Sequence, residues 1–339
     1  MPTSIERTVA AIARAFASTF SSALGSSRAS ALVPARALAP APAFALALAP
    51  ALALALAFVL GTSSTAAAQS VGTSISTGRE KGSYYYIGQR LGTTMLMKHG
   101  YRIAVETSSG SVQNLARLAD PSSPTGLALT QSDALSRFLQ GNREFENKLI
   151  VLGDAGRECV VLVGARRGGI LRFADLAAAE GAEISVDDPG SGAAATFDFL
   201  VSMDPGLGSL RPVFVDTMEA LLQLKVGGSH TDLVAAMWVQ RPAMRSAPVK
   251  ILLDNPSDYR LIPILPTEVE NRKLPDDSVV YTFEKVRIGS DRTDAGLEVE
   301  TICTRSLLLG SKDKLDREIR SKLSVTMLES GAEVIGGGH

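Results

Sequence analysis

From about residue 70 onward, short apolar runs alternate with segments of helical periodicity, and small polar residues separate them. The runs predict strands at 71–75, 101–108, 126–131 and 159–164, with helices in between. The last two runs are almost continuously apolar, which is typical of strands buried in a parallel sheet. This βαβαβ order predicts an α/β domain with right-handed crossovers.

The same pattern begins again after residue 165. Strands are expected at 183–188, 210–216 and 232–238, with helices after the first two. Two α/β lobes in tandem form a cleft, where ligands usually bind. The apolar run 301–310 has no place in the second lobe, so we expect it beside strand 159–164. The predicted organisation is a first lobe at 69–165, a second lobe at 166–265, a return crossover at 266–298, and the rest of the first lobe with a closing helix at 299–339.

The first 68 residues have a different composition. They are rich in Ala, Leu, Ser and Pro, contain four arginines and one acidic residue, and include an apolar run at 44–60. Ala66 and Ala68 then stand in the A-x-A arrangement of a cleavage site. This order predicts a cleavable signal peptide at 1–68 and a periplasmic protein. A membrane span is the alternative, but Pro50 interrupts the run.

The charge and the chemistry-bearing residues exclude several classes of protein. Without the leader, 30 basic and 34 acidic residues leave a net charge of −4, which provides no electrostatic footprint for nucleic acid. His99, His230 and His339 do not cluster with cysteines at metal-ligand spacing, and no nucleophile elbow, P-loop or dinucleotide fingerprint occurs. We therefore expect no catalytic residue, metal or cofactor. Cys159 and Cys303 could pair in an exported protein, or remain two buried free thiols.

Four loops of small polar residues each follow a predicted strand. Each alone is an ordinary turn. Together they line one edge of two predicted sheets, where hydroxyl and N–H groups at helix N-termini can hold a small anion. Tyr84 and Tyr85 would add an apolar wall with phenol donors, and Trp238 could close the cleft or belong to the core. The loops are STGREKGS (76–83), SSGS (108–111), TQSD (130–133) and PGSG (189–192).

These segments carry family motifs in order. GSYYYIG (82–88) corresponds to G-T-Y-Y-P-L-G, SSGSVQNLARLA (108–119) to T-G-G-S-V-E-N-L, QSD (131–133) to Q-A-D, and DDPGSGAA (187–194) to G-x-P-G-S-G-T. Over about residues 70 to 310 the chain thus resembles the TAXI family of solute-binding proteins, the extracytoplasmic receptors of tripartite ATP-independent periplasmic (TRAP) transporters. It departs from the family at GREKG (78–82), which looks like an insertion, and at Tyr86 and Ala193. We interpret Arg79, Glu80 and Lys81 as solvated loop charges.

The resemblance implies a type II periplasmic-binding-protein-like α/β fold, with two lobes around a central cleft. It implies a monomer that captures a small organic anion, a carboxylate or acidic amino acid, for the membrane subunits of a TRAP-type transporter. Ser111 is expected to cap its helix and could also face the ligand, and Asn114 could do either. The fold also makes a cross-strand disulfide between Cys159 and Cys303 possible. The implied ligand-binding residues are Ser76, Thr77, Tyr84, Tyr85, Ser109, Gly110, Ser111, Asn114, Gln131, Ser191, Gly192 and Trp238.

Two other functions use the same fold. A ligand-sensing periplasmic module would keep the pocket and differ only in its signalling partner. An enzyme would need a general base in the cleft, for which Glu80, Asp133, Asp187 and Asp188 are the candidates. Because Asp187 and Asp188 are adjacent, we expect only one of them to face the cleft.

Overall fold

The computed structural model describes residues 72–227, 232–269, 279–290 and 296–336, all of which belong to the unit that begins at Ala66. The predicted signal peptide, His230 and His339 lie outside the described residues. Within the described part, no helix combines the length and the apolar character needed to cross a membrane.

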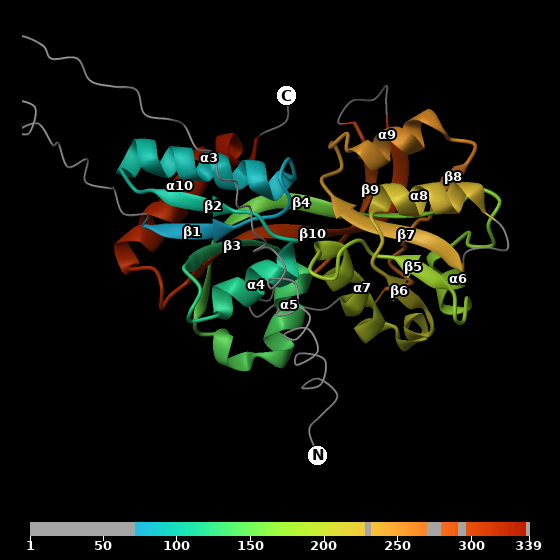
Figure 1. Cartoon of the computed structure of the whole chain (residues 1–339), viewed down its shortest axis with the longest axis horizontal. Helices are drawn as coiled ribbons and strands as arrows, with labels where there is room; N and C mark the ends of the chain where they lie inside the picture. The colour runs from blue at the N-terminus through green and yellow to red at the C-terminus, as the bar shows by residue number, and fades with distance from the viewer. Residues whose placement is uncertain (1–71, 228–231, 270–278, 291–295, 337–339) are drawn as a thin grey trace, which may run out of the picture. The chain divides into compact units, whose positions relative to one another are not determined.

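The first half of the unit consists of three βα pairs, as the sequence predicts. β1 pairs in parallel with both β2 and β3. Helices α3 and α10 cover one face of these strands, and α4 and α5 cover the other (Figure 1). We call this part lobe I. Its elements are β1 (Thr73–Ser76), α3 (Ser83–His99), β2 (Ile103–Glu106), α4 (Ser111–Ala119), β3 (Thr125–Gln131), α5 (Ser132–Gly141), the 3₁₀ turn η1 (Arg143–Phe145) and α10 (Arg317–Ile335).

The second half repeats the arrangement. β5 lies between β6 and β7 and runs parallel to both. The helix after β7, α9, is not predicted from the sequence; Ser246 caps it and Pro248 stands in its first turn. We call this part lobe II. It contains α6 (Phe173–Ala177), β5 (Glu183–Ser185), α7 (Gly192–Met203), η2 (Pro205–Ser209), β6 (Arg211–Val213), α8 (Thr217–Val226), β7 (Leu233–Gln240), α9 (Ala247–Asp254), β8 (Tyr259–Leu261) and β9 (Thr282–Ile288).

Two long strands, β4 (Leu149–Ala165) and β10 (Leu297–Ser311), connect the lobes. They pair antiparallel from Leu149 and Ser311 as far as Cys159 and Cys303. Beyond that pair β4 continues against β7 and β10 continues against β9. The run 301–310 thus lies beside the fourth strand, as predicted, but it pairs with the earlier part of β4, and Cys159 is the one residue of the predicted strand 159–164 that pairs with it. The expectation of two separate sheets is wrong, because both strands run through both lobes and join the described strands in one sheet of order β2-β1-β3-β10-β4-β7-β5-β6, with β8 on β4 and β9 on β10.

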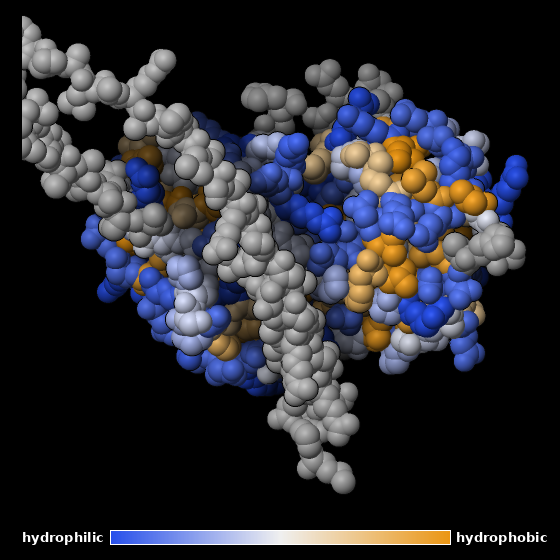
Figure 2. Space-filling model, viewed as in Figure 1, coloured by the Kyte–Doolittle hydropathy of each residue, from blue (hydrophilic) through white to orange (hydrophobic). Residues whose placement is uncertain are grey.

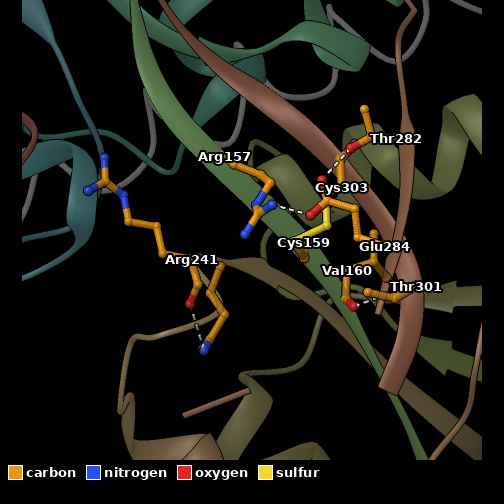
Figure 3. The surroundings of a disulfide bond; sticks show 9 residues. Arg157, Cys159, Val160, Arg241, Thr282, Glu284, Thr301 and Cys303 are labelled. Atoms are coloured by element: carbon orange, nitrogen blue, oxygen red, sulfur yellow. Dashed lines mark hydrogen bonds and ion pairs between the residues drawn. A yellow bond between two sulfur atoms is a disulfide. The ribbon is translucent and has the colours of Figure 1, made fainter. Parts of the chain in front are cut away.

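A disulfide joins Cys159 and Cys303 at the pair where these two strands separate (Figure 3). The predicted cross-strand disulfide is confirmed, and the alternative of two free thiols is wrong. Further interactions surround it. Thr301 Oγ1 donates to the carbonyl oxygen of Val160 at 2.9 Å, and Arg157 pairs with Glu284 of β9. The separation point of β4 and β10 is thus held by covalent, hydrogen-bonding and ionic links.

A buried carboxylate joins the lobes on another side. Asp133 of α5 accepts hydrogen bonds from Thr196 Oγ1 of α7 at 2.6 Å and from the Tyr281 hydroxyl at 2.9 Å. Burial raises the pKa of the Asp133 carboxyl, and these hydrogen bonds only partly oppose that effect. Asp133 therefore links the two lobes through hydrogen bonds. Keeping its buried carboxylate charged costs free energy in the folded state.

Some apolar side chains remain at the surface of lobe II. Phe214, Leu222 and Val226 are more than half exposed, and Figure 2 shows apolar surface in the region of α8 and β7. Exposed apolar side chains are usual in folded proteins, so we assign these no function.

Removing the disulfide is expected to destabilise the protein strongly. The bond closes a sequence separation of 144 residues, and loss of a native disulfide typically costs about 2–5 kcal/mol. The double variant Cys159→Ala/Cys303→Ala, compared with wild type in urea unfolding, should show a loss in that range. Wild type treated with a reductant should approach the variant. A loss below about 0.5 kcal/mol, the size of a neutral surface change, would contradict a stabilising role.

The cost of the Asp133 charge is expected to make stability depend on pH. An acid whose pKa is raised by folding stabilises the folded state most at pH values below its unfolded pKa of about 3.9, and this contribution is lost as the pH rises through the folded pKa. The unfolding free energy of wild type minus that of Asp133→Asn should therefore fall as the pH is raised from about 4 towards neutrality. Chemical denaturation at several pH values measures the difference, and a difference that grows with pH would refute this assignment.

Candidate functional site

A cavity of about 500 Å³ opens between the two lobes, at the carboxyl ends of their parallel strands. Each of the strands β1, β2, β3, β5, β6 and β7 leads into a helix whose first or capping residue lies in the cavity wall. Six helix N-termini of the described chain therefore meet at this cavity. The residues at these positions are Ser83 of α3, Ser111 of α4, Gln131 before α5, Gly192 of α7, Thr217 of α8 and Ala247 of α9.

The N-termini differ between the lobes. In lobe II, side chains of Ser191, Asp216 and Ser246 accept hydrogen bonds from the first turns of α7, α8 and α9. In lobe I, none of α3, α4 and α5 has such a side-chain cap. Two first-turn N–H groups of lobe I already have other partners, since Val112 donates to the carbonyl oxygen of Gly190 and Ala134 donates to Asp133 Oδ1. The remaining N–H groups at these uncapped N-termini need water or a ligand as partners. The lobe I side of the cavity is thus the side that offers backbone donors.

The loops SSGS and PGSG touch each other across the cleft. The backbone N–H of Val112 donates to the carbonyl oxygen of Gly190 at 3.2 Å. A Cβ atom at Gly110 would lie 3.0 Å from the Cα of Ser191, and Gly110 has φ of 137°, which side chains disfavour. Glycine is therefore required where the two lobes close on each other.

The floor of the cavity is a buried polar cluster. Glu158 of β4, 5% exposed, accepts hydrogen bonds from the Tyr84 hydroxyl at 3.0 Å and from Gln131 Nε2 at 3.3 Å. Burial raises the pKa of Glu158, while the hydrogen bond from Tyr84 and the charge of Arg241 oppose the rise. Burial and the neighbouring carboxylate together raise the pKa of Tyr84 well above its usual value.

Two polar atoms of the wall have no hydrogen-bond partner among the described residues. They are the hydroxyl oxygen of Ser83 and the amide oxygen Oε1 of Gln131, and both are buried. Buried polar atoms are normally paired, so such atoms at a cavity indicate a place for water or a ligand. Gln131 Oε1 and the Glu158 carboxylate are both acceptors, and the floor therefore suits a group that donates hydrogen bonds.

Most of the residues predicted to bind a ligand lie in this wall, but four do not. Ser76 and Thr77 are buried behind it, and Tyr85 is half-buried outside it. Asn114 Oδ1 accepts from Ser76 Oγ at 2.7 Å and from Ser108 Oγ at 2.6 Å, and its Nδ2 donates to backbone carbonyls of Thr77 and Leu129. Asn114 thus ties two of the loops and strand β3 together from behind. The eight in the wall are Tyr84, Ser109, Gly110, Ser111, Gln131, Ser191, Gly192 and Trp238.

The predicted capping role of Ser111 is wrong. The N-cap of α4 is Gly110, and Ser111 is the first residue of the helix. The Ser111 hydroxyl instead accepts the backbone N–H of Gln131 at 3.2 Å, which links α4 to the end of β3. Gln113 Oε1 reaches back to the backbone N–H of Ser109 at 2.8 Å. The helix therefore begins one residue earlier, and the loop is one residue shorter, than a cap at Ser111 would give.

Trp238 satisfies both roles that the sequence left open. Trp238 is 6% exposed and packs in the core against residues of α8 and α9. The ring also reaches the cavity wall, where Nε1 donates to Gln240 Oε1 at 3.1 Å. Gln240 accepts a second hydrogen bond from Ser246 Oγ at 2.7 Å, which connects Trp238 to the cap of α9.

Several wall residues are missing from the sequence prediction. Glu158 was overlooked because the predicted strand starts at Cys159, whereas β4 begins ten residues earlier, at Leu149. A charged residue directly before the apolar run 159–164 is the one available signal. Gln240 and Ser246 were overlooked with α9, since only the cap motif Ser246–Pro248 marks that helix.

The charged loop is in the wall as well. Arg79, Glu80 and Lys81 all line the cavity. Arg79 is half-exposed, and its guanidinium also pairs with Asp187 of lobe II at 3.0 Å, a contact that the interpretation as solvated loop charges does not include. Asp187 lines the cavity and Asp188 does not, so only one of the two faces the cleft, as expected.

Metal binding and general-base catalysis are the two other chemical roles to consider at this cavity. Among the described residues, no three His, Cys, Asp or Glu side chains gather as metal ligands. Of the candidate bases, Asp133 is buried outside the wall and Asp187 is engaged by Arg79. Of the remaining candidates, Glu80 lines the cavity and Asp188 does not.

A family model described as the NMT1-like family matches residues 75–334. The chain belongs to this family. The match spans both lobes and all the loops of the cavity. No curated protein matches the chain.

Solved structures similar to this member of the NMT1-like family each cover 78% of the chain. They are the periplasmic aliphatic sulphonate binding protein SsuA from Escherichia coli (16% identity, 72% of that chain, TM-score 0.40), XAC2383 from Xanthomonas citri bound to ATP (9%, 85%, 0.48) and a TctC solute binding protein from Polaromonas (14%, 83%, 0.43). The structure has the two α/β lobes around a central cleft that the sequence predicts, and the predicted fold class is confirmed.

Adding a methyl group at Gly192 is expected to oppose closure of the cleft. A Cβ atom there would overlap the Gln131 side-chain amide, and overpacking of this kind typically costs about 1–3 kcal/mol. Thermal or urea unfolding of Gly192→Ala should show a loss in that range. Gly141→Ala is the control, since nothing lies within 4 Å of its Cβ position. Equal effects of the two variants would contradict the tight interlobe contact.

Proposed function

We propose that this chain is a periplasmic solute-binding protein of the TAXI type. It works as a monomer and captures a small organic anion, a carboxylate or acidic amino acid, for the membrane subunits of a TRAP-type transporter. The supporting observation is the set of uncapped N-termini of α3, α4 and α5 in the cavity wall. Their N–H groups and helix dipoles favour a negatively charged group.

The side-chain charges of the wall narrow the choice of ligand. Arg79 and Lys81 are its basic residues, and Glu80, Glu158, Asp187 and Asp216 are its acidic ones. Such a wall does not attract anions by net charge, so the backbone donors must provide the anion site. Glu158 and the free Gln131 Oε1 are acceptors on the floor and suit an ammonium group. An acidic amino acid satisfies both halves of the cavity better than a plain dicarboxylate does.

A thermal-shift comparison of matched acids tests this proposal. L-Glutamate and glutarate differ by the amino group, as do L-aspartate and succinate. A ligand present at 100 times its Kd stabilises the folded state by about 2.7 kcal/mol, which is a clear shift in Tm. We expect the amino acids to stabilise the protein without its leader more than their deaminated partners do. A complete lack of stabilisation by any of the four would contradict the proposal.

Glu158→Gln provides the matched variant for that experiment. Glutamine keeps the size and one acceptor but removes the charge that would face an ammonium group. Because hydrogen bonds to charged groups contribute about 1.5–3 kcal/mol, amino-acid affinity should fall by about 10- to 150-fold while glutarate affinity stays within about twofold. Titration calorimetry measures both ligands. An equal loss for both would indicate that Glu158 only supports the floor.

A further inference from the structure

Arg79 bridges the mouth of the cleft. It belongs to the loop between β1 and α3 in lobe I, and its guanidinium lies 3.0 Å from Asp187, 3.7 Å from Asp188 and 3.9 Å from Asp216. All three carboxylates belong to lobe II, on the loop after β5 and at the N-cap of α8. Arg79, Asp187 and Asp216 are also wall residues, so the ion pairs lie directly over the cavity.

The backbone is strained on both sides of this bridge. In the described part of the chain, Lys81 (φ 64°) and Asp187 (φ 61°) are the two residues other than glycine with positive φ. Such conformations cost of order 1 kcal/mol or more and cluster at clamps and switch regions. Here one belongs to the loop that carries Arg79, and the other is the residue that Arg79 contacts most closely. The surrounding structure therefore holds both loops in the conformation that forms the pair.

The ion pairs between the lobes at this point share one cation, the guanidinium of Arg79. Asp187, Asp188 and Asp216 lie close enough for each to face the same guanidinium. Burial raises the pKa of Asp187, Arg79 lowers it, and the other two carboxylates raise it further. Without Arg79, lobe II would present three like charges at the mouth of the cleft.

We propose that Arg79 is an interlobe latch, which holds the cleft closed by pairing with Asp187 and Asp216 and thereby controls access to the cavity. The inference rests on the proposed function in treating the cavity as a ligand site. The latch itself is a property of the chain without ligand. The inserted loop 78–82 acquires a role through it, because it places Arg79 opposite the lobe II carboxylates.

Distance measurements on the ligand-free protein test the latch. Spin labels at Met97→Cys on α3 and Val226→Cys on α8 report on the two lobes, since these side chains are 81% and 83% exposed. The native cysteines are joined in the disulfide and do not compete for label. Pulsed electron paramagnetic resonance should show a short distance in the labelled wild-type background. In Arg79→Ala a longer distance should gain weight, with the closed-to-open ratio falling about two- to fivefold, the range for partly exposed ion pairs.

Two further variants distinguish the effect of breaking the latch from the effect of losing any charged side chain. Asp187→Asn removes the charge but tolerates positive φ, so it should open the cleft as Arg79→Ala does. Arg211→Ala is the matched control, because Arg211 is similarly exposed and pairs with Glu183 at 3.1 Å and Asp232 at 2.9 Å within lobe II. It should leave the distance unchanged. At 1 M salt the wild-type distribution should move towards that of Arg79→Ala.

The outcomes distinguish this inference from the proposed function. Equal distance distributions in wild type and Arg79→Ala, no change in Asp187→Asn, or an equal change in Arg211→Ala would each overturn the latch. A protein that opens in Arg79→Ala but is stabilised by none of the four acids would keep the latch and overturn the proposed function. A protein that binds an acid but does not open would do the reverse.

Discussion

The structure depends on the pairing of β4 with β10. These two strands are the backbone that both lobes share, and they separate at Cys159 and Cys303. A covalent bond at this point fixes the register of the pair and the place from which each strand enters lobe II. The ends of the parallel strands, and hence the cavity, are positioned relative to the point where β4 and β10 separate. The disulfide is thus a constraint on the site as well as on stability.

The cavity forms because one set of βα repeats lies on each side of the point where β4 and β10 separate. Parallel strands direct the N-termini of their following helices to one edge, and the two edges face each other. Small residues allow the SSGS and PGSG loops to touch, and the Arg79 ion pairs lie beside that contact. Closure therefore combines backbone fit, which glycine permits, with charge pairing, which the loop 78–82 supplies.

Much of this arrangement could be predicted from local patterns. Alternating apolar runs and helical segments locate the strands and helices of the repeats, and the order of the small-residue loops brings Ser109, Ser111, Gln131 and Ser191 into one site. The prediction failed where a residue's role depends on distant partners. Asn114 is read as a ligand residue because it follows a Gly/Ser loop, yet it holds Thr77 and Leu129 from behind the wall. Glu158 gives one weak local signal, a charge directly before an apolar run, because its site is completed by Tyr84, 74 residues away.

By itself, the sequence determined the α/β class, the tandem repeat and the loops that carry small polar residues, since periodicity and turn chemistry are local properties of the chain. Only the tertiary structure decided that β4 and β10 join the lobes in one sheet and that Arg79 faces three carboxylates of the other lobe. Contacts such as the one between Arg79 and Asp187, 108 residues apart, arise from the packing of the whole unit. A loop charge therefore looks solvated in the sequence and becomes an interlobe contact in the folded chain.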